Sequence, residues 1–233
     1  MLPPTLLHDL DVRLFLATDA LDDVRWASAR AMIDGVVLPD AALLGASSSA
    51  DSLLWLGDFA RAVTIPVFVA LRGASPDDAE LEAEQLGRAA DNVVVQMPFA
   101  EPYIPLMHRL AATGVKIAAT FVGSASQAML AARTGVAYVF VDVDRIDAAG
   151  ASGATVIEQA RRALDHAVDE ADLVAVFPSS GAPLLACALA GADAAVLGIA
   201  ALRALLAYPF TDGALPDGTR RPVSGARLRV TAS

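Results

Sequence analysis

Short apolar runs alternate with longer amphipathic segments along most of the chain. Eight runs rich in strand-forming residues fall at 13–17, 35–38, 65–71, 92–97, 115–121, 137–143, 172–177 and 193–198. Segments with the helical spacing of apolar positions follow them near 20–32, 50–62, 76–90, 101–112, 124–134, 153–168, 181–190 and 199–206. A repeated strand–helix alternation is typical of βα units and a parallel sheet.

The number of units favours a closed barrel. Eight strand–helix pairs fit into about 200 residues, which is the size of a (β/α)8 barrel. The main alternative, an open doubly wound sheet, needs a glycine-rich phosphate loop after the first strand, and LFLATDALDD has no glycine there. We therefore predict an α/β protein with a single TIM barrel over residues 1–212 and a Pro/Gly/Arg-rich tail over 213–233.

Cap residues agree with these boundaries. Ser75 precedes Pro76 and an acidic first turn, which predicts that a helix begins there. Gly114, Gly135 and Gly191 each stand between a helical segment and a strand, as helix C-caps do.

Composition narrows the class of protein. The chain is 55% hydrophobic and 19% charged, with a formal charge of −10, which argues against a nucleic-acid partner. No apolar run is long enough to span a membrane, and the opening MLPPTLLHDLDV has no basic signal-peptide region. A single cysteine, Cys187, excludes an internal disulfide and fits a reducing compartment. We expect a cytoplasmic protein.

The C-terminal tail carries a local excess of positive charge, from Arg220, Arg221, Arg227 and Arg229. It either docks on the acidic body or a neighbouring subunit, or remains solvated.

Five segments resemble the small transaldolase and fructose-6-phosphate aldolase family. They are RLFLATDALDDVR, IDGVVLPDAAL, NVVVQMP, DRIDAAGASG and AGADAAVLGIAALRALLAYPFTD, in the family's order over roughly residues 12–212. The third is similar to the family's Val-Val-Val-Lys-(Ile/Val)-Pro. The resemblance implies an aldolase-type barrel that assembles into a homo-oligomer.

The resemblance also implies that the family's chemistry is altered. Its lysine forms an iminium with a ketose carbonyl, which is the electron sink for carbon–carbon cleavage. Gln96 stands at that position, and an amide cannot form the imine. Lys116, the only lysine in the chain, begins the fifth strand, and we expect it at the opposite rim of the barrel.

Other family positions differ as well. The family's acid on strand one aligns with Ala17, and the polar residue of strand three aligns with Ala70. The Asn of strand two aligns with Pro39, or is displaced by one position if Pro39 matches the family's proline. The serine that ends strand seven aligns with Phe177, which together with Phe140 is expected to decide whether the pocket is open or plugged. Thr120 and Arg145 match the family pattern, which implies roles in organising water and binding a substrate phosphate.

The candidate site consists of polar residues at or just after predicted strand ends: Asp40, Arg72, Gln96, Thr120, Asp142, Asp144, Arg145, Ser179 and Ser180. We assign catalytic roles to Asp142 as general acid/base and to Thr120 and Gln96 as positioning groups. Alternatively, Asp142 forms an ion pair with Arg145 or Arg72, and Gln96 hydrogen-bonds Thr120. Asp144 is expected to be a loop or cap residue.

A ligand anion is expected to bind Arg145 and the backbone around Ser179 and Ser180, which open the predicted seventh helix; Asp40 and Arg72 complete the substrate-binding set. The alternative for the serines is ordinary N-capping. The histidines, His8, His108 and His166, do not fall at strand ends, so we expect neither a metal nor another cofactor.

Two functions remain open. One is an enzyme, without Schiff-base chemistry, that acts on a small polyol, keto or sugar-phosphate-like metabolite. The other is a non-catalytic relative that binds a ligand or partner for regulation or assembly. The predominance of arginine over lysine points to a bacterial source with a GC-rich genome.

Overall fold

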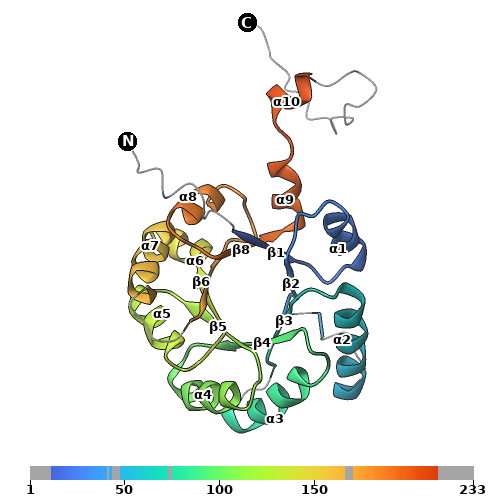
Figure 1. Cartoon of the computed structure of the whole chain (residues 1–233), viewed down its shortest axis with the longest axis vertical. Coiled ribbons are helices and arrows are strands. Elements are labelled where there is room, and N and C mark those ends of the chain that lie inside the picture. The colour runs from blue at the N-terminus through green and yellow to red at the C-terminus, as the bar shows by residue number, and fades with distance from the viewer. Residues whose placement is uncertain (1–11, 41, 44–47, 73–74, 166–169, 215–233) are drawn as a thin grey trace, which may run out of the picture.

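The computed structural model describes residues 12–40, 42–43, 48–72, 75–165 and 170–214, and it contains the predicted closed barrel (Figure 1). The strands are parallel and neighbour one another in chain order, and β1 pairs with β8 to close the ring. Their bounds are β1 Arg13–Ala17, β2 Gly35–Val37, β3 Val67–Ala70, β4 Val93–Pro98, β5 Ile117–Val122, β6 Tyr138–Asp142, β7 Asp172–Val176 and β8 Ala194–Gly198.

Helices surround the strands, as the alternating pattern predicts (Figure 1). They are α1 Leu21–Ser28, α2 Ser49–Val63, α3 Pro76–Gly87, α4 Ile104–Ala112, α5 Ala125–Ala132, α7 Gly153–Leu164, α8 Leu184–Leu189 and α9 Ile199–Leu205. Three further elements were not predicted as separate helices: the 3-10 turn η2 Glu101–Tyr103, α6 Val143–Ala148 and α10 Pro209–Ala214. None of the helices described is long and apolar enough to cross a membrane.

The predicted caps are confirmed. Ser75 accepts a hydrogen bond from the Asp78 amide with Pro76 in the first turn of α3. Gly114, Gly135 and Gly191 adopt φ angles of 89°, 82° and 94°, a left-handed conformation that glycine accepts at little cost.

One predicted helix start is wrong. The helix expected over 181–190 begins at Leu184, so the segment from Pro178 to Gly181 precedes it as a turn. Pro183 explains the difference, because the residue before a proline is disfavoured in helical conformation. The predicted tail lies outside the described residues, apart from 213 and 214 within α10.

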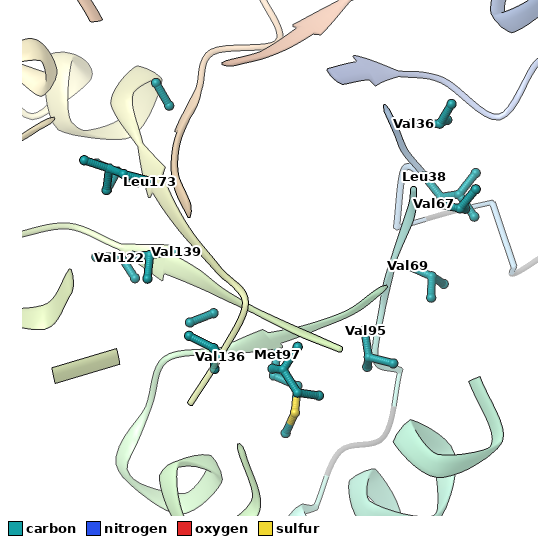
Figure 2. Packing of buried hydrophobic residues seen from close by; sticks show 14 of the residues in the cluster. Val36, Leu38, Val67, Val69, Val95, Met97, Val122, Val136, Val139 and Leu173 are labelled. Atoms are coloured by element: carbon teal, nitrogen blue, oxygen red, sulfur yellow. The ribbon is translucent and has the colours of Figure 1, made fainter. Parts of the chain in front are cut away.

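The larger apolar layer lies between the strands and the helices. Its strand residues include Val36, Val67, Val95, Met97 and Leu173, which all point away from the barrel axis (Figure 2). These side chains are buried almost completely. Because both faces of the strands are covered, the strands are continuous apolar runs rather than alternating ones.

A second, smaller layer fills the barrel itself. Phe68 lies 4.8 Å from Phe15 and 5.2 Å from Phe140 between ring centroids. Below these rings, Arg13 and Asp172 form an ion pair of 2.7 Å. Burial raises the pKa of the neighbouring Tyr138, and the charge of Asp172 raises it further. The aromatic layer closes the middle of the barrel and leaves its upper end as a separate compartment.

Candidate functional site

A cavity of about 550 Å³ opens at the C-terminal ends of the strands, where barrel enzymes hold their active sites. Asp40, Gln96, Thr120 and Asp142 are its polar lining residues, and the other described lining residues are apolar. Phe140, with only 3% of its surface exposed, lies at the floor. The volume falls in the range of small-molecule sites, roughly 300–1,000 Å³.

Gln96 reaches this cavity from the middle of β4. It lies in register with Ala70 of β3 and Ala118 of β5, and 9% of its surface is exposed. Its backbone carbonyl accepts a hydrogen bond from Leu71, but its side-chain amide has no hydrogen-bond partner among the described residues. The alternative bond to Thr120 is therefore not formed, and the amide is available to a ligand.

Asp142 ends β6 and begins α6. One carboxylate oxygen accepts a hydrogen bond of 3.2 Å from the Arg145 backbone amide, and the other lies 3.8 Å from Arg145 Nε. Asp142 and Arg145 thus form the ion pair that was the alternative to a catalytic role. Asp142 still lines the cavity, so the same carboxylate faces both a helix terminus and the ligand space.

Phe121 is a lining residue that the sequence analysis did not single out. The residue is 55% exposed, and the Arg145 guanidinium lies over its ring at 5.6 Å from the centroid. A phenylalanine between Thr120 and Val122 in an apolar strand carries no sequence signal for this position, because regular alternation would turn it toward the helices.

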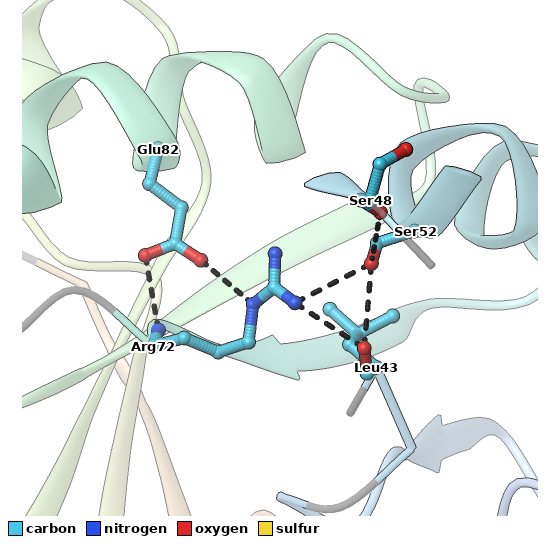
Figure 3. A network of polar contacts seen from close by, with 5 residues as sticks. All are labelled: Leu43, Ser48, Ser52, Arg72 and Glu82. Atoms are coloured by element: carbon cyan, nitrogen blue, oxygen red, sulfur yellow. Dashed lines mark hydrogen bonds and ion pairs between the residues drawn. The ribbon is translucent and has the colours of Figure 1, made fainter. Parts of the chain in front are cut away.

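Arg72 lies outside the cavity, in a polar network between α2 and α3 (Figure 3). Its Nε is 3.2 Å from Glu82, and Nη1 donates to the Leu43 carbonyl at 3.2 Å and to Ser52 Oγ at 3.3 Å. Ser52 is only 1% exposed. These contacts tie two helices to the loop after β2, and they direct the guanidinium away from Asp142.

The predicted anion-binding serines also lie outside the lining of the cavity. The Ser179 amide donates to Asp144 at 3.4 Å, so a carboxylate of the protein occupies that donor. Ser180 Oγ accepts a bond of 3.1 Å from the Ala182 amide within the turn before α8. Ser180 thus bonds within a turn and does not cap α8, whose N-cap is Pro183 without a side-chain cap bond, so the alternative of N-capping is not formed either. Asp144 joins the start of α6 to the loop after β7.

Three remaining residues lie away from the cavity. Lys116 precedes β5, and its Nζ donates to the Asp91 carbonyl at 3.0 Å in the loop before β4, which is the opposite end of the barrel. Phe177 is fully buried in the outer apolar layer, so it does not plug the cavity. Cys187 is also buried, and desolvation raises the pKa of its thiol to about 11.

Comparison with known proteins identifies the scaffold. The family model described as transaldolase/fructose-6-phosphate aldolase matches residues 65–215, well over half of the chain. The chain belongs to this family. A probable transaldolase of Maridesulfovibrio salexigens is 30% identical over 204 residues, which cover 88% of this chain and 94% of the relative. A probable transaldolase of Bartonella tribocorum is 27% identical, with 88% and 93% covered.

A solved structure described as "Native KDPGal structure" resembles this member of the transaldolase family in fold. The TM-score is 0.54 at 16% sequence identity, over 82% of this chain and 83% of that one. At that identity the similarity supports the barrel architecture alone. Family membership confirms the resemblance seen in the sequence, and it makes the amide at position 96 the feature that a functional account has to explain.

Proposed function

We propose that this transaldolase-family protein has lost Schiff-base aldol chemistry and acts on a small, uncharged keto compound by acid/base chemistry. The observation that carries the proposal is the side chain of Gln96. It lines the open cavity on β4, and its amide has no partner among the described residues. The amide is therefore free to donate a hydrogen bond to a ligand's carbonyl oxygen or to accept one from a ligand's hydroxyl group.

The preference for an uncharged ligand rests on the cavity lining. Neither arginine nor lysine is among the described lining residues, whereas binding a phosphate ordinarily requires such groups. Arg145 is directed toward Asp142 and the Phe121 ring, and the Ser179 amide is bonded to Asp144. These contacts do not support the expectation that Arg145 and the backbone around Ser179 bind an anion.

The chemistry that these groups can perform is proton transfer next to a carbonyl. The Asp142 carboxylate takes a proton from the carbon beside the carbonyl, and the electron pair of that C–H bond moves to form the enolate. The Gln96 amide and the Thr120 hydroxyl donate hydrogen bonds to the oxygen on which negative charge develops. Return of a proton to carbon or oxygen completes the step, so no lysine and no cofactor are needed.

Deuterium exchange tests this proposal without knowledge of the natural substrate. Hydroxyacetone in D2O would be followed by proton NMR, and we expect the protein to accelerate loss of the signal next to the carbonyl. Asp142→Asn should slow the exchange by about 10²- to 10⁴-fold, because it removes the base but keeps a capping oxygen for α6. Exchange at an unchanged rate in Asp142→Asn would rule out Asp142 as the base.

A non-catalytic, ligand-binding protein is the second candidate. The observation that favours it is the cap that Asp142 provides to α6, since this hydrogen bond occupies one oxygen of the carboxylate that would have to act as the base. Saturation-transfer NMR would then detect hydroxyacetone binding, weakened in Gln96→Leu, with no acceleration of exchange. Absence of binding in the wild-type protein would contradict both candidates.

We also propose a cytoplasmic homo-oligomer, as the family resemblance implies. Figure 1 shows that α9 and α10 project from the barrel, and large apolar side chains are exposed along this arm, including Leu206, Tyr208 and Phe210. Sedimentation velocity should give a mass above 24.0 kDa that falls in a Tyr208→Asp/Phe210→Asp variant. A wild-type monomer would contradict this assembly.

A further inference from the structure

Phe121 has a backbone conformation that separates it from the rest of the barrel. Its φ angle is 59°, in the left-handed region that is unfavourable for a bulky side chain. Among the described residues, the other non-glycine positions with positive φ are Ala31, just after α1, and Thr64, which caps α2. Left-handed residues are common at helix ends, whereas Phe121 lies within a strand.

The strain accompanies a β-bulge in β5. Ala119 pairs with Val139 and Val122 pairs with Val141, so two residues of β5 oppose one residue of β6. Thr120 and Phe121 are these two residues, and both line the cavity. Consecutive residues of a regular strand point to opposite faces, so the bulge is what brings the phenyl ring to the cavity mouth.

Arg145 contacts the Phe121 ring at the cavity mouth. The Arg145 guanidinium lies over it at 5.6 Å, and Arg145 Nε lies 3.8 Å from the Asp142 carboxylate. Phe121 nevertheless remains 55% exposed. Folding gains little from a strained backbone that leaves a large apolar side chain in solvent, and such strain is characteristic of functional sites.

We propose that Phe121 is a specificity-determining stacking platform for a ligand with a flat aromatic or conjugated part. This inference rests on the proposed function, because it places that part at the mouth while the ligand's carbonyl or hydroxyl group meets Gln96 and Thr120 below. Most of the remaining lining is apolar, from residues such as Val37, Leu71 and Val176, which suits a ring better than a polyhydroxylated chain.

Two ketones of similar size provide the test. The probes are acetophenone, which has a planar ring conjugated with its carbonyl, and cyclohexyl methyl ketone, which has a puckered aliphatic ring. Dissociation constants would be measured by saturation-transfer NMR on the full chain. We expect acetophenone to bind about threefold to tenfold more tightly, the range that aromatic pairing contributes beyond buried area.

The variants assign this preference to the ring. Phe121→Leu keeps an apolar side chain and should lose the preference for acetophenone while still binding both ketones. Phe121→Gly removes the ring together with the backbone strain, so its melting temperature should not fall, and it should also lose the preference. Leu81→Ala, a truncation on the exposed face of α3 at a residue 62% exposed, is the control and should retain it.

The outcomes separate the inference from the proposed function. If neither ring ketone binds the wild-type protein but hydroxyacetone does, the stacking platform alone is overturned; if none of the three binds, the proposed function is overturned as well. If both ketones bind but the preference is absent, or persists in Phe121→Leu, the stacking platform alone is overturned. If another chain covers the ring instead, Phe121→Leu will change the sedimentation coefficient and leave ketone selectivity unchanged, which also overturns it.

Discussion

Gly35 supports the floor of the cavity, and its replacement by alanine tests how the barrel interior is packed. Gly35 lies on β2 opposite Phe15 of β1. A methyl group at its Cα would lie 2.8 Å from Phe15 Cδ1 and 3.3 Å from Phe68 Cε2. Phe15 and Phe68 are at least 99% buried, so the added methyl group can be accommodated only if their rings move. We expect the rings to be displaced toward the cavity.

The cost can be isolated by comparison with a second glycine. Gly123, which follows β5, has only Gln127 Oε1 near an added methyl group, at 3.8 Å, and neither glycine has a positive φ. Both substitutions restrict the unfolded chain equally, so this contribution cancels between them. The difference then reports overpacking, which is typically about 1–3 kcal/mol.

Urea unfolding followed by circular dichroism measures this difference. Gly35→Ala should be less stable than Gly123→Ala by about 1–3 kcal/mol, or by about 2–12 °C in melting temperature. Weaker ligand binding by Gly35→Ala should accompany the loss, since displaced rings enter the cavity. Equal stability of the two variants would refute the close packing of the aromatic layer.

Three other substitutions follow from the structure. Arg72→Met should destabilise the fold by about 1–3 kcal/mol through loss of its network, without affecting ketone binding; weakened binding at unchanged stability would contradict its structural role. Burial raises the pKa of Cys187 from 9.0 to about 11, so the thiol keeps its proton to a higher pH in the folded state than in the unfolded chain. This stabilisation is complete below pH 9 and is lost as the pH rises through 11; Cys187→Ala should remove that dependence, and an unchanged profile would argue against it. Gln96→Lys alone should not restore fructose 6-phosphate cleavage, because Ala17 and Ala70 replace polar family positions; efficient cleavage would mean that the surrounding site is intact.

The barrel follows from local patterns in the sequence. β1 occupies the predicted residues 13–17, and the other strands differ from prediction by at most two residues at either end. Continuous apolar runs buried on both faces give a strong signal, and glycine C-caps mark the start of three of these runs, those of β5, β6 and β8. α6 was missed because it follows β6 directly, where Asp142 both ends the strand and caps the helix.

The candidate site was predictable only in part. Gln96, Thr120, Asp142 and Asp40 line one cavity, as expected of polar residues at or just after the C-terminal ends of barrel strands. The direction of the Arg72 side chain depends on its contacts with Glu82 of α3 and Ser52 of α2. Its position just after β3 does not predict these contacts, because both partners lie at least ten residues away in the sequence. The bulge that exposes Phe121 depends on pairing between strands, which no local pattern encodes.

Borohydride trapping tests the central claim most directly. The protein would be incubated with dihydroxyacetone or fructose 6-phosphate, reduced with sodium borohydride and analysed by intact-mass and peptide mass spectrometry. Reduction converts any lysine imine to a stable amine, so an active Schiff-base aldolase gains the mass of the reduced ligand. We predict no such adduct, because Gln96 cannot form an imine and Lys116 lies at the opposite end of the barrel. A substrate-dependent adduct at Lys116 would contradict the loss of imine chemistry.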